Sequence, residues 1–353
     1  MATGVKVGPG IIAWHVGDPV DGAIPSFGER FREEKGALLA VASTVPYNHA
    51  TPAAWGGHSP SRGDYPRLCE SILHEVKADV IIGGGHPLYY QGTQSGYVYQ
   101  YITEDIYTEM QANAPDADYV FVERTDGLNG EDLLMEGFAA AKAEGKKLFG
   151  LFGGAGGDFE PPVPTGGGVS RATTENPLLH HVVTQTLDYL REMDEDKGFF
   201  ALFEQGDIDW ANHNNHYRMM IGTMWDLDEA VKAACSFVDQ PGDDIDWDNT
   251  LLVVTSDHAN SFMRLSDDVR LGQGELPEQV PLGKTWQHGY RYPGGEVSYQ
   301  SGGHTNEPVM LYAKGEAARL FRLYEGVWYP GTRLVDNTHL YEVCALAAGL
   351  ATE

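Results

Sequence analysis

A carboxylate and an imidazole stand four residues apart in the run FEQGDIDWANH, residues 203–213. The run follows the apolar segment FFALF and opens into an amphipathic pattern typical of a long helix, so Asp209 and His213 are expected to share one helix face. Glu204, at the end of the expected strand, can point into the same space. Oxygen and nitrogen ligands of this kind suit Zn²⁺. Taken alone, the pair also fits a solvated helix face or a helix cap.

Two later segments have the same character. The apolar run LLVVTSDHAN, residues 251–260, ends in Asp257 and His258, and ligands of open α/β sheets bind outside the carboxyl ends of the strands. His304 stands in the Gly-rich turn SGGHTNEP before another strand-like run, where the glycines permit close backbone approach. Taken singly, these residues are also explained as a helix cap, a surface histidine and a neutral turn. Three such segments in one chain favour a metal centre.

The order of these residues resembles the alkaline phosphatase family. The pattern is E-x4-D-x3-H, then T-x-D-H at a strand end, then G-H-T before a strand. The stretch NHATPAAWGGHSPSR, residues 48–62, is similar to the family segment that carries a metal-site threonine and a phosphate-binding arginine. ADVIIGGG, residues 78–85, and DNTHLYEVCALAAGL, residues 336–350, are similar as well, so the resemblance covers nearly the whole chain.

The resemblance implies one or two zinc ions and, in an incomplete site, a magnesium ion. Their ligands would be Asp209, His213 and His304 for the first zinc, Asp257 and His258 for the second, and Glu204 and Thr51 for magnesium. Without the resemblance, Thr51 would be interpreted as the N-cap of a helix that begins at PAAW.

The resemblance also implies three residues that act beside the metals. Arg62 would bind two phosphate oxygens through its planar guanidinium group, although by itself it reads as a surface cation. His49 and Trp210 stand at positions that vary between family members. They would lie next to the metal ligands without binding the metals and would change the properties of the metals and of their bound waters.

The beginning of the chain departs from the family pattern. MATGVKVG, residues 1–8, is similar to the stretch that follows the nucleophilic serine in the family. The D-S-A-type motif with that serine, and the first strand with its metal-bridging aspartate, are therefore expected to be absent. We expect a fragment or a truncated reading frame, or else a natural short form. In a short form, a water activated by zinc would be the nucleophile, since zinc brings the pKa of bound water to roughly 7.

The resemblance implies a metal-dependent phosphomonoester hydrolase that releases inorganic phosphate from a small phosphorylated substrate. A phosphodiesterase, sulfatase or phosphonate hydrolase of the same superfamily shares the D-x3-H, D-H and H pattern but generally lacks the 48–62 stretch. A zinc-binding fragment without turnover is a second alternative. An acidic structural domain with incidental histidines is a third.

The composition fits one large globular domain, residues 1–353, and disfavours some partners. With 353 residues, 42% of them hydrophobic, the chain can bury a substantial core. Its 51 acidic and 24 basic residues give a net charge of −27, which repels nucleic acid and anionic membranes. An anionic substrate would therefore require the metals and Arg62 to reverse this field locally.

Cysteine usage and hydropathy add little to the function. The cysteines Cys69, Cys235 and Cys344 are widely spaced, so neither a disulfide framework nor a thiolate metal site is expected. We expect no secretory signal within residues 1–353, and no apolar run among them is long enough to span a bilayer. The resemblance implies a periplasmic or extracellular homodimer.

Strand-like runs alternate with helical patterns along the chain, which predicts an α/β fold with a mostly parallel central sheet and helices on both faces. Strands are expected within 37–44, 78–85, 118–125 and 146–154, and helices within 27–36, 131–145 and 176–197. The Gly- and Pro-rich residues 153–168 predict a long loop, and 264–303 predict an inserted, crown-like subdomain or loop over the site. An absent first strand would leave an unpaired sheet edge, which favours dimerisation.

Overall fold

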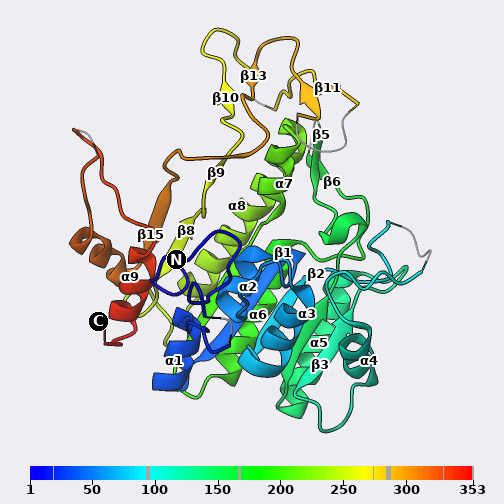
Figure 1. Ribbon diagram of the computed structural model, residues 1–353, viewed down its shortest axis with the longest axis vertical. Coiled ribbons are helices and arrows are strands. Elements are labelled where there is room, and N and C mark those ends of the chain that lie inside the picture. Colours follow the sequence, from blue (N-terminus) through cyan, green and yellow to red (C-terminus); the bar gives the residue numbers. More distant parts are fainter. Residues whose placement is uncertain are drawn as a thin grey trace.

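A five-stranded parallel sheet forms the centre of the molecule, in the order β3-β4-β2-β1-β7. The computed structural model describes residues 1–18, 20–92, 96–165, 168–272, 274–283, 288–328 and 330–351. The sheet strands are β1 (Leu38–Pro46), β2 (Val80–Gly84), β3 (Tyr119–Glu123), β4 (Lys147–Leu151) and β7 (Phe199–Glu204). Helices cover both faces of this sheet, so the predicted α/β architecture is confirmed (Figure 1).

Two hydrophobic clusters, one on each face of the sheet, hold the layers together. Alternate residues of β1 enter opposite clusters, with Leu39 and Val41 in one and Ala40 and Ala42 in the other. Because both faces are covered, the strands read as continuous apolar runs rather than as alternating patterns. The first cluster packs against α1 (Phe27–Lys35), α2 (Ala50–Gly56), α3 (Tyr65–Glu70), α4 (Glu104–Ala112), α9 (His339–Ala347) and the π-helix at Ser71–Val76. The second cluster packs against α5 (Gly130–Glu144), α6 (Leu179–Met193) and α8 (Tyr217–Asp239).

Local signals set the helix ends much as expected. Ser26 and Glu29 form a capping box at the start of α1, and Gly36 ends it with φ at 78°, a left-handed conformation in which glycine carries no steric penalty. The predicted helix within 27–36 and its glycine stop are therefore confirmed. No helix in the described ranges combines the length and apolarity that a bilayer crossing requires.

Residues 207–239 differ from the single long helix that the sequence predicts. The seven-residue helix α7 (Asp207–His213) ends first, and α8 begins at Tyr217. Asn215 takes a positive φ of 54° between them, and the ring of His216 accepts a hydrogen bond from the Met219 backbone N–H, which caps the new helix. Asp209 and His213 still share one face, because both lie within α7.

The second half of the chain builds smaller strand pairs beside and above the sheet. Antiparallel β8 (Leu252–Thr255) and β15 (Leu311–Lys314) form one pair, and β9 (Ala259–Asn260) with β14 (His304–Thr305) forms another. The short antiparallel pairs β10 (Arg264–Leu265) with β13 (Val297–Ser298), and β11 (Val280–Pro281) with β12 (Tyr290–Arg291), form the upper projection in Figure 1. They belong to the region predicted as an insertion, of which residues 273 and 284–287 lie outside the described residues.

The predicted loop at 153–168 contains some regular structure. A 3-10 turn, Ala155–Gly157, is followed by β5 (Val163–Thr165), which pairs with β6 (Gly168–Ser170). A second 3-10 segment, Glu316–Leu323, leads towards α9.

Candidate metal centre

The strand pairing brings the predicted ligands to one edge of the molecule. Glu204 is the last residue of β7, and α7 with Asp209 and His213 follows directly. His258 lies between β8 and β9, and the β9–β14 ladder sets His304 opposite Asn260. Three segments that are far apart in sequence therefore meet at the carboxyl ends of the strands, where ligands of open α/β sheets bind.

Four of these side chains converge. Asp209, His258 and His304 each offer one possible ligand atom, and these three atoms lie within 4.8 Å of one another. The Nε2 atom of His213 lies 3.2 Å from Asp209 Oδ2 and 3.2 Å from His304 Nε2, and His304 Nε2 lies 3.3 Å from Asp209 Oδ1. The rings of His258 and His304 stack with centroids 3.6 Å apart. The structure therefore gathers the side chains that were predicted for the first zinc, together with His258.

The proton positions at His213 fit a cation at this place. Its Nδ1 atom lies 2.8 Å from the carbonyl oxygen of Gly302, and a carbonyl only accepts, so Nδ1 carries the proton. In the neutral ring, Nε2 then presents a lone pair towards Asp209 and His304. A cation between these atoms would accept the lone pairs of all of them. Without a cation, His213 must take a second proton on Nε2 to bond with Asp209. The carboxylate and imidazole donors fit Zn²⁺.

Hydrogen bonds and charges set the protonation of this cluster. The hydrogen bond with Asp209 raises the pKa of His213. Burial favours the protonated form of Asp209, but hydrogen bonds from His213 and Asn260 outweigh it and lower the pKa. Asn260 Nδ2 donates to Asp209 Oδ1 at 2.5 Å and thereby orients the carboxylate. Burial and the neighbouring His258 lower the pKa of His304.

Asp257 lies at the margin of the cluster. Its carboxylate Oδ2 is 3.1 Å from His258 Nε2, and its side chain is 53% exposed. Its charge also acts on Glu204, so Asp257 lies near the predicted magnesium residues as well as beside His258.

Glu204 and Thr51 are brought together at the end of β7. Ser43, which pairs with Glu204 in the β1–β7 ladder, donates its hydroxyl to Glu204 Oε2 at 2.5 Å. Burial raises the pKa of Glu204 to about 7, against the lowering effect of hydrogen bonds from Ser43 and Thr51. The interpretation of Thr51 as an N-cap is wrong: His49 holds the N-cap position of α2, and Thr51 lies in the first turn with its hydroxyl bonded to Glu204.

Arg62, His49 and Trp210 lie next to these ligands. The rings of His49 and Trp210 meet edge to face with centroids 5.7 Å apart. Burial, together with the charge of Arg62, lowers the pKa of His49 to about 4, although the charge of Asp209 acts in the opposite direction. Arg62 is exposed, and its backbone N–H donates to the carbonyl of Gly10 at 2.8 Å. Because of its lowered pKa, the His49 ring is neutral at neutral pH.

Sequence reasoning missed two residues that hold the ligands in place. Ser43 binds Glu204, and Asn260 binds Asp209. Ser43 was detectable, because a polar residue ends the apolar run of β1 at the sheet edge where ligands bind. Asn260 follows Asp257 by three residues and His258 by two, but its contact with α7 depends on the tertiary fold.

Sequence reasoning also missed a buried carboxyl pair behind the cluster. Asp207 is 0% exposed, and Thr44 donates to its Oδ2 atom at 2.6 Å. Burial raises the pKa of Asp207 well above the usual range, and the charge of Asp158 adds to this effect. Burial likewise raises the pKa of Asp158 to about 6.

Replacing Asp207 with asparagine is therefore expected to stabilise the protein in alkali. Both carboxyls have native-state pKa values above those of the unfolded chain, so their unfavourable energy grows as the pH rises from about 4 towards and beyond the native values. Asp207→Asn removes one of the charges and should raise the free energy of unfolding by roughly 1–3 kcal/mol at about pH 8, with a smaller effect at about pH 5. Urea denaturation at both pH values measures this, and equal effects would refute it.

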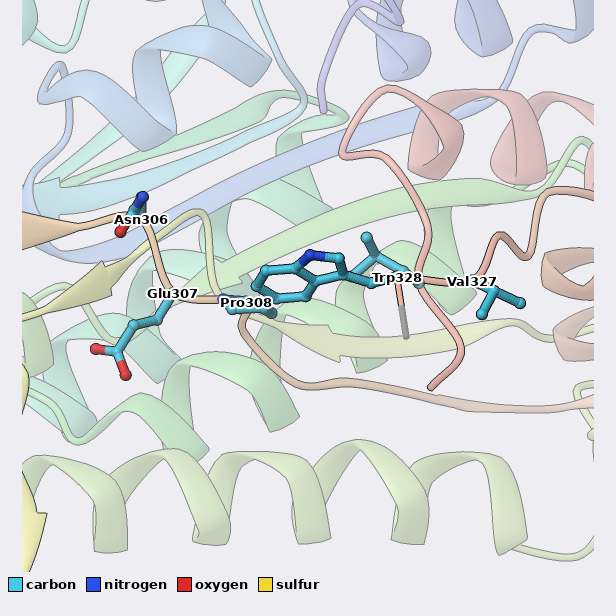
Figure 2. A pocket seen from close by; sticks show the side chains of 6 residues that line it. Asn306, Glu307, Pro308, Val327 and Trp328 are labelled. Carbon is cyan, nitrogen blue, oxygen red and sulfur yellow. The ribbon is translucent and has the colours of Figure 1, made fainter. Parts of the chain in front are cut away.

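A separate surface hollow of about 410 Å³ lies just after His304 in the chain and is not part of this cluster (Figure 2). It is lined by Asn306, Glu307, Pro308, Val327, Trp328 and Leu334. Figure 2 shows the Trp328 indole beside Pro308, with the Glu307 carboxylate pointing away from it. Glu307 is paired with Arg264, so the hollow offers mainly apolar side chains. The chemistry belongs to the side-chain cluster instead.

The fold and the site together define a class of protein: an α/β protein with a cluster of carboxylate and histidine side chains at the ends of its strands. The chain belongs to the alkaline phosphatase family, whose family model, described as "Alkaline phosphatase", matches residues 1–276.

Individual relatives agree with this assignment. The chain is 25% identical over 234 residues to alkaline phosphatase 4 of Bacillus subtilis, which covers 64% of this chain and 41% of that protein. It is 25% identical over 268 residues to the human tissue-nonspecific isozyme of alkaline phosphatase, and this match covers 66% of this chain and 44% of that protein. It is 26% identical over 270 residues to the Escherichia coli alkaline phosphatase, and this match covers 67% of this chain and 52% of that protein. The matches thus span about half the length of these curated relatives.

Solved structures share the fold. The alkaline phosphatase from the Antarctic bacterium TAB5 aligns with a TM-score of 0.66 at 18% identity and covers 99% of this chain and 82% of that one. The Thermus thermophilus alkaline phosphatase aligns with a TM-score of 0.66 at 22% identity, and the alignment covers 100% of this chain and 78% of that one.

Proposed function

We propose that this chain is a metal-dependent phosphomonoester hydrolase of the alkaline phosphatase type. The observation that carries the proposal is the convergence of Asp209, His213, His258 and His304, with the lone pair of His213 turned into the cluster. The family supports a phosphatase-type hydrolase. Arg62, next to this cluster, supports an anionic phosphate group as the ligand.

Each side chain has a defined task in this proposal. Asp209, His213 and His304 would hold one zinc ion, and Asp257 with His258 would contribute to a second. Bound zinc supplies a Lewis acid that draws charge from the phosphoryl oxygens and from the leaving oxygen. Gly302 fixes the ring of His213, and Asn260 fixes the carboxylate of Asp209, so the ligands need no reorganisation.

Arg62 would orient the substrate. Its planar guanidinium group can donate two parallel hydrogen bonds to two phosphate oxygens, which a lysine cannot do with the same geometry. Because the pKa of His49 is lowered to about 4, that ring is neutral at neutral pH and does not compete for the phosphate as a second cation. The net charge of −27 makes such a local cation necessary for an anionic substrate.

Hydrolysis assays with three related esters test the proposal. The purified chain with zinc and magnesium is expected to hydrolyse p-nitrophenyl phosphate faster than bis(p-nitrophenyl) phosphate and p-nitrophenyl sulfate. His304→Ala and a zinc-only blank serve as controls. Turnover of the monoester no faster than the blank would refute the proposal, and a preference for the diester or sulfate would favour the other branches of the superfamily.

A zinc-binding protein without turnover is the second candidate. It is favoured by the exposed carboxylate of Asp257, a predicted ligand of the second zinc. Zinc that raises the melting temperature without any hydrolysis would favour this candidate, because a ligand that binds only the native state stabilises it by mass action.

Magnesium binding near Glu204 is expected to strengthen as the pH rises. One solved TAB5 variant carries Mg in a site called M3, and we propose Glu204 and Thr51 as magnesium ligands here. The pKa of Glu204 is raised to about 7, so at lower pH magnesium must displace a proton. The affinity should therefore fall ~10-fold for each pH unit below that value. Isothermal titration from about pH 5.5 to about pH 8 measures it, with Glu204→Gln as the control that should lose the dependence. An affinity of the wild type that does not change over this range would refute the assignment.

The family resemblance further leads us to propose a homodimer that acts outside the cytoplasm. Light scattering coupled to size exclusion tests the dimer, and a monomer at micromolar concentration would refute it.

A further inference from the structure

Ser261 follows the short strand β9 beside the metal centre and is completely buried. It is 0% exposed, although it lies only three residues after His258 and directly after Asn260. Its φ is 62° and that of Phe262 is 49°, so two consecutive residues with side chains adopt the left-handed conformation that favours glycine. Such conformations persist only where the surroundings fix them, and they cluster at functional sites. The contacts that fix Ser261 all lead to the metal centre.

The backbone of Ser261 holds the Gly-rich segment that leads to His304. Its N–H donates to the carbonyl of Gly303 at 2.9 Å. Its carbonyl accepts from the N–H groups of Gln300 at 3.1 Å and of Ser301 at 3.2 Å. These bonds to a single residue fix the course of the segment, and β14 with His304 begins directly after it.

The same segment and the Ser261 hydroxyl also reach the C-terminal end of α7. The carbonyl of Gly302 lies 2.8 Å from His213 Nδ1, and Oγ of Ser261 donates to the carbonyl of Asn212 at 2.5 Å. Asn212 directly precedes His213 in the chain. Ser261 therefore connects the helix that carries His213 to the segment that orients the His213 ring.

The hydroxyl of Ser261 also sets the orientation of the Asn260 amide. Its Oγ atom lies 2.7 Å from Asn260 Oδ1, and the hydroxyl shares its one proton between this oxygen and the carbonyl of Asn212. The Nδ2 atom of the same amide donates to Asp209 Oδ1. An amide rotated by half a turn would place its oxygen against the carboxylate of Asp209, where two acceptors repel each other. A donor at Oδ1 therefore keeps the Asn260 N–H groups directed at Asp209.

We propose that Ser261 is a positioning residue of the zinc site, whose hydroxyl fixes the Asn260 amide, which in turn orients the carboxylate of Asp209. This inference rests on the zinc binding in the proposed function. Loss of the partner of a metal ligand typically lowers metal affinity 10- to 100-fold, because the ligand is no longer held in place. A hydroxyl is required here, since Asn260 Oδ1 and the Asn212 carbonyl only accept, and a buried acceptor without a donor is unfavourable. Serine is the smallest residue that supplies a hydroxyl at a fully buried position.

Two substitutions separate the Ser261 hydroxyl from the backbone conformation. Ser261→Ala removes the hydroxyl, and Ser261→Gly removes it as well but suits the φ of 62° better. Both variants should bind zinc about 10-fold more weakly than the parent, measured by competition with a chelator. The metal-free Ser261→Gly variant should melt no lower than Ser261→Ala, so that the loss of zinc affinity does not follow the stability of the fold. Zinc affinity within about 2-fold of the parent in both variants would overturn the proposal.

A double-mutant cycle with Asn260→Ala tests the route through the amide. If the hydroxyl acts through Asn260, Ser261→Ala should lower zinc affinity about 10-fold in the parent but about 2-fold or less in the Asn260→Ala background, because residues that share one network are not additive. Cobalt(II) in place of zinc provides a second readout, since its visible absorption follows the geometry of the ligands. The two single variants should change this spectrum in the same way. A loss of about 10-fold in both backgrounds would overturn the proposed route.

Ser266→Ala is the matched control for the loss of a serine hydroxyl. Ser266 lies in the inserted region, where its Oγ atom accepts from the N–H groups of Asp268 and Val269, each at 3.2 Å. This variant should retain the zinc affinity and the cobalt spectrum of the parent. A parent protein that binds no zinc would overturn both this inference and the proposed function. A parent that binds zinc equally well with and without the Ser261 hydroxyl would overturn the inference alone.

Discussion

Replacing Asp209 with alanine is expected to lower kcat/KM for p-nitrophenyl phosphate at least about 100-fold, because loss of even an indirect partner of a metal ligand typically lowers activity 10- to 100-fold. Asp209 contacts two of the other side chains of the cluster: its carboxylate oxygens lie 3.2 Å from His213 Nε2 and 3.3 Å from His304 Nε2. Steady-state kinetics and zinc titration of the same preparation measure the effect. The apparent zinc affinity should fall in parallel with activity.

A matched variant controls for the change in charge. Asp267 is an exposed carboxylate in the inserted region, and Asp267→Ala alters the net charge by the same amount. This variant should retain the activity and zinc affinity of the parent. If Asp209→Ala kept the parent's activity while circular dichroism showed a folded protein, the assignment of Asp209 as a zinc ligand would be wrong.

Replacing Arg124 with methionine is expected to lower the free energy of unfolding by about 3–5 kcal/mol, because it leaves the partly buried carboxylates of Glu160 and Glu175 without their buried cation. Arg124 is 8% exposed and bonds to Glu160 Oε1 at 2.9 Å, to Glu175 Oε2 at 2.8 Å and to the carbonyl of Gly153 at 2.8 Å. Methionine preserves much of the side-chain volume but none of these bonds. Urea denaturation at neutral pH measures the loss.

An exposed ion pair provides the comparison. Arg333 lies 3.6 Å from Glu325 with its side chain 74% exposed, so Arg333→Met should change the free energy of unfolding by no more than about 1 kcal/mol. Similar losses in the two variants would show that the Arg124 network contributes no more than a surface pair.

The sheet could be predicted from the sequence because its signal is local. Runs such as VIIGG in β2, and LFGL after the first residue of β4, are apolar, which is typical of strands covered on both faces. The break between α7 and α8 could not be predicted, because the stop is made by the positive φ of Asn215 and by the His216 ring, and neither interrupts the apolar spacing.

The site was predictable where residue type and strand ends coincide. Asp257 and His258 follow the apolar strand β8, and Glu204 ends the apolar strand β7, so all three stand at strand ends of the kind where ligands of open α/β sheets bind. The helix cap at Thr51 was predicted wrongly, because local preference favoured a cap while the hydroxyl bonds to Glu204 from a distant strand. The pair of Asp158 and Asp207 was not predicted, since it forms between segments that only the complete fold brings together.

Anomalous diffraction at the zinc edge, from crystals grown with zinc, tests the central claim most directly. We expect a peak within about 2.0–2.3 Å of Asp209, His213 and His304, the distances at which carboxylate and imidazole ligands bind this metal. Zinc found only at other surface sites, or no peak between these three side chains, would contradict the assignment of a metal centre and the hydrolase proposed from it.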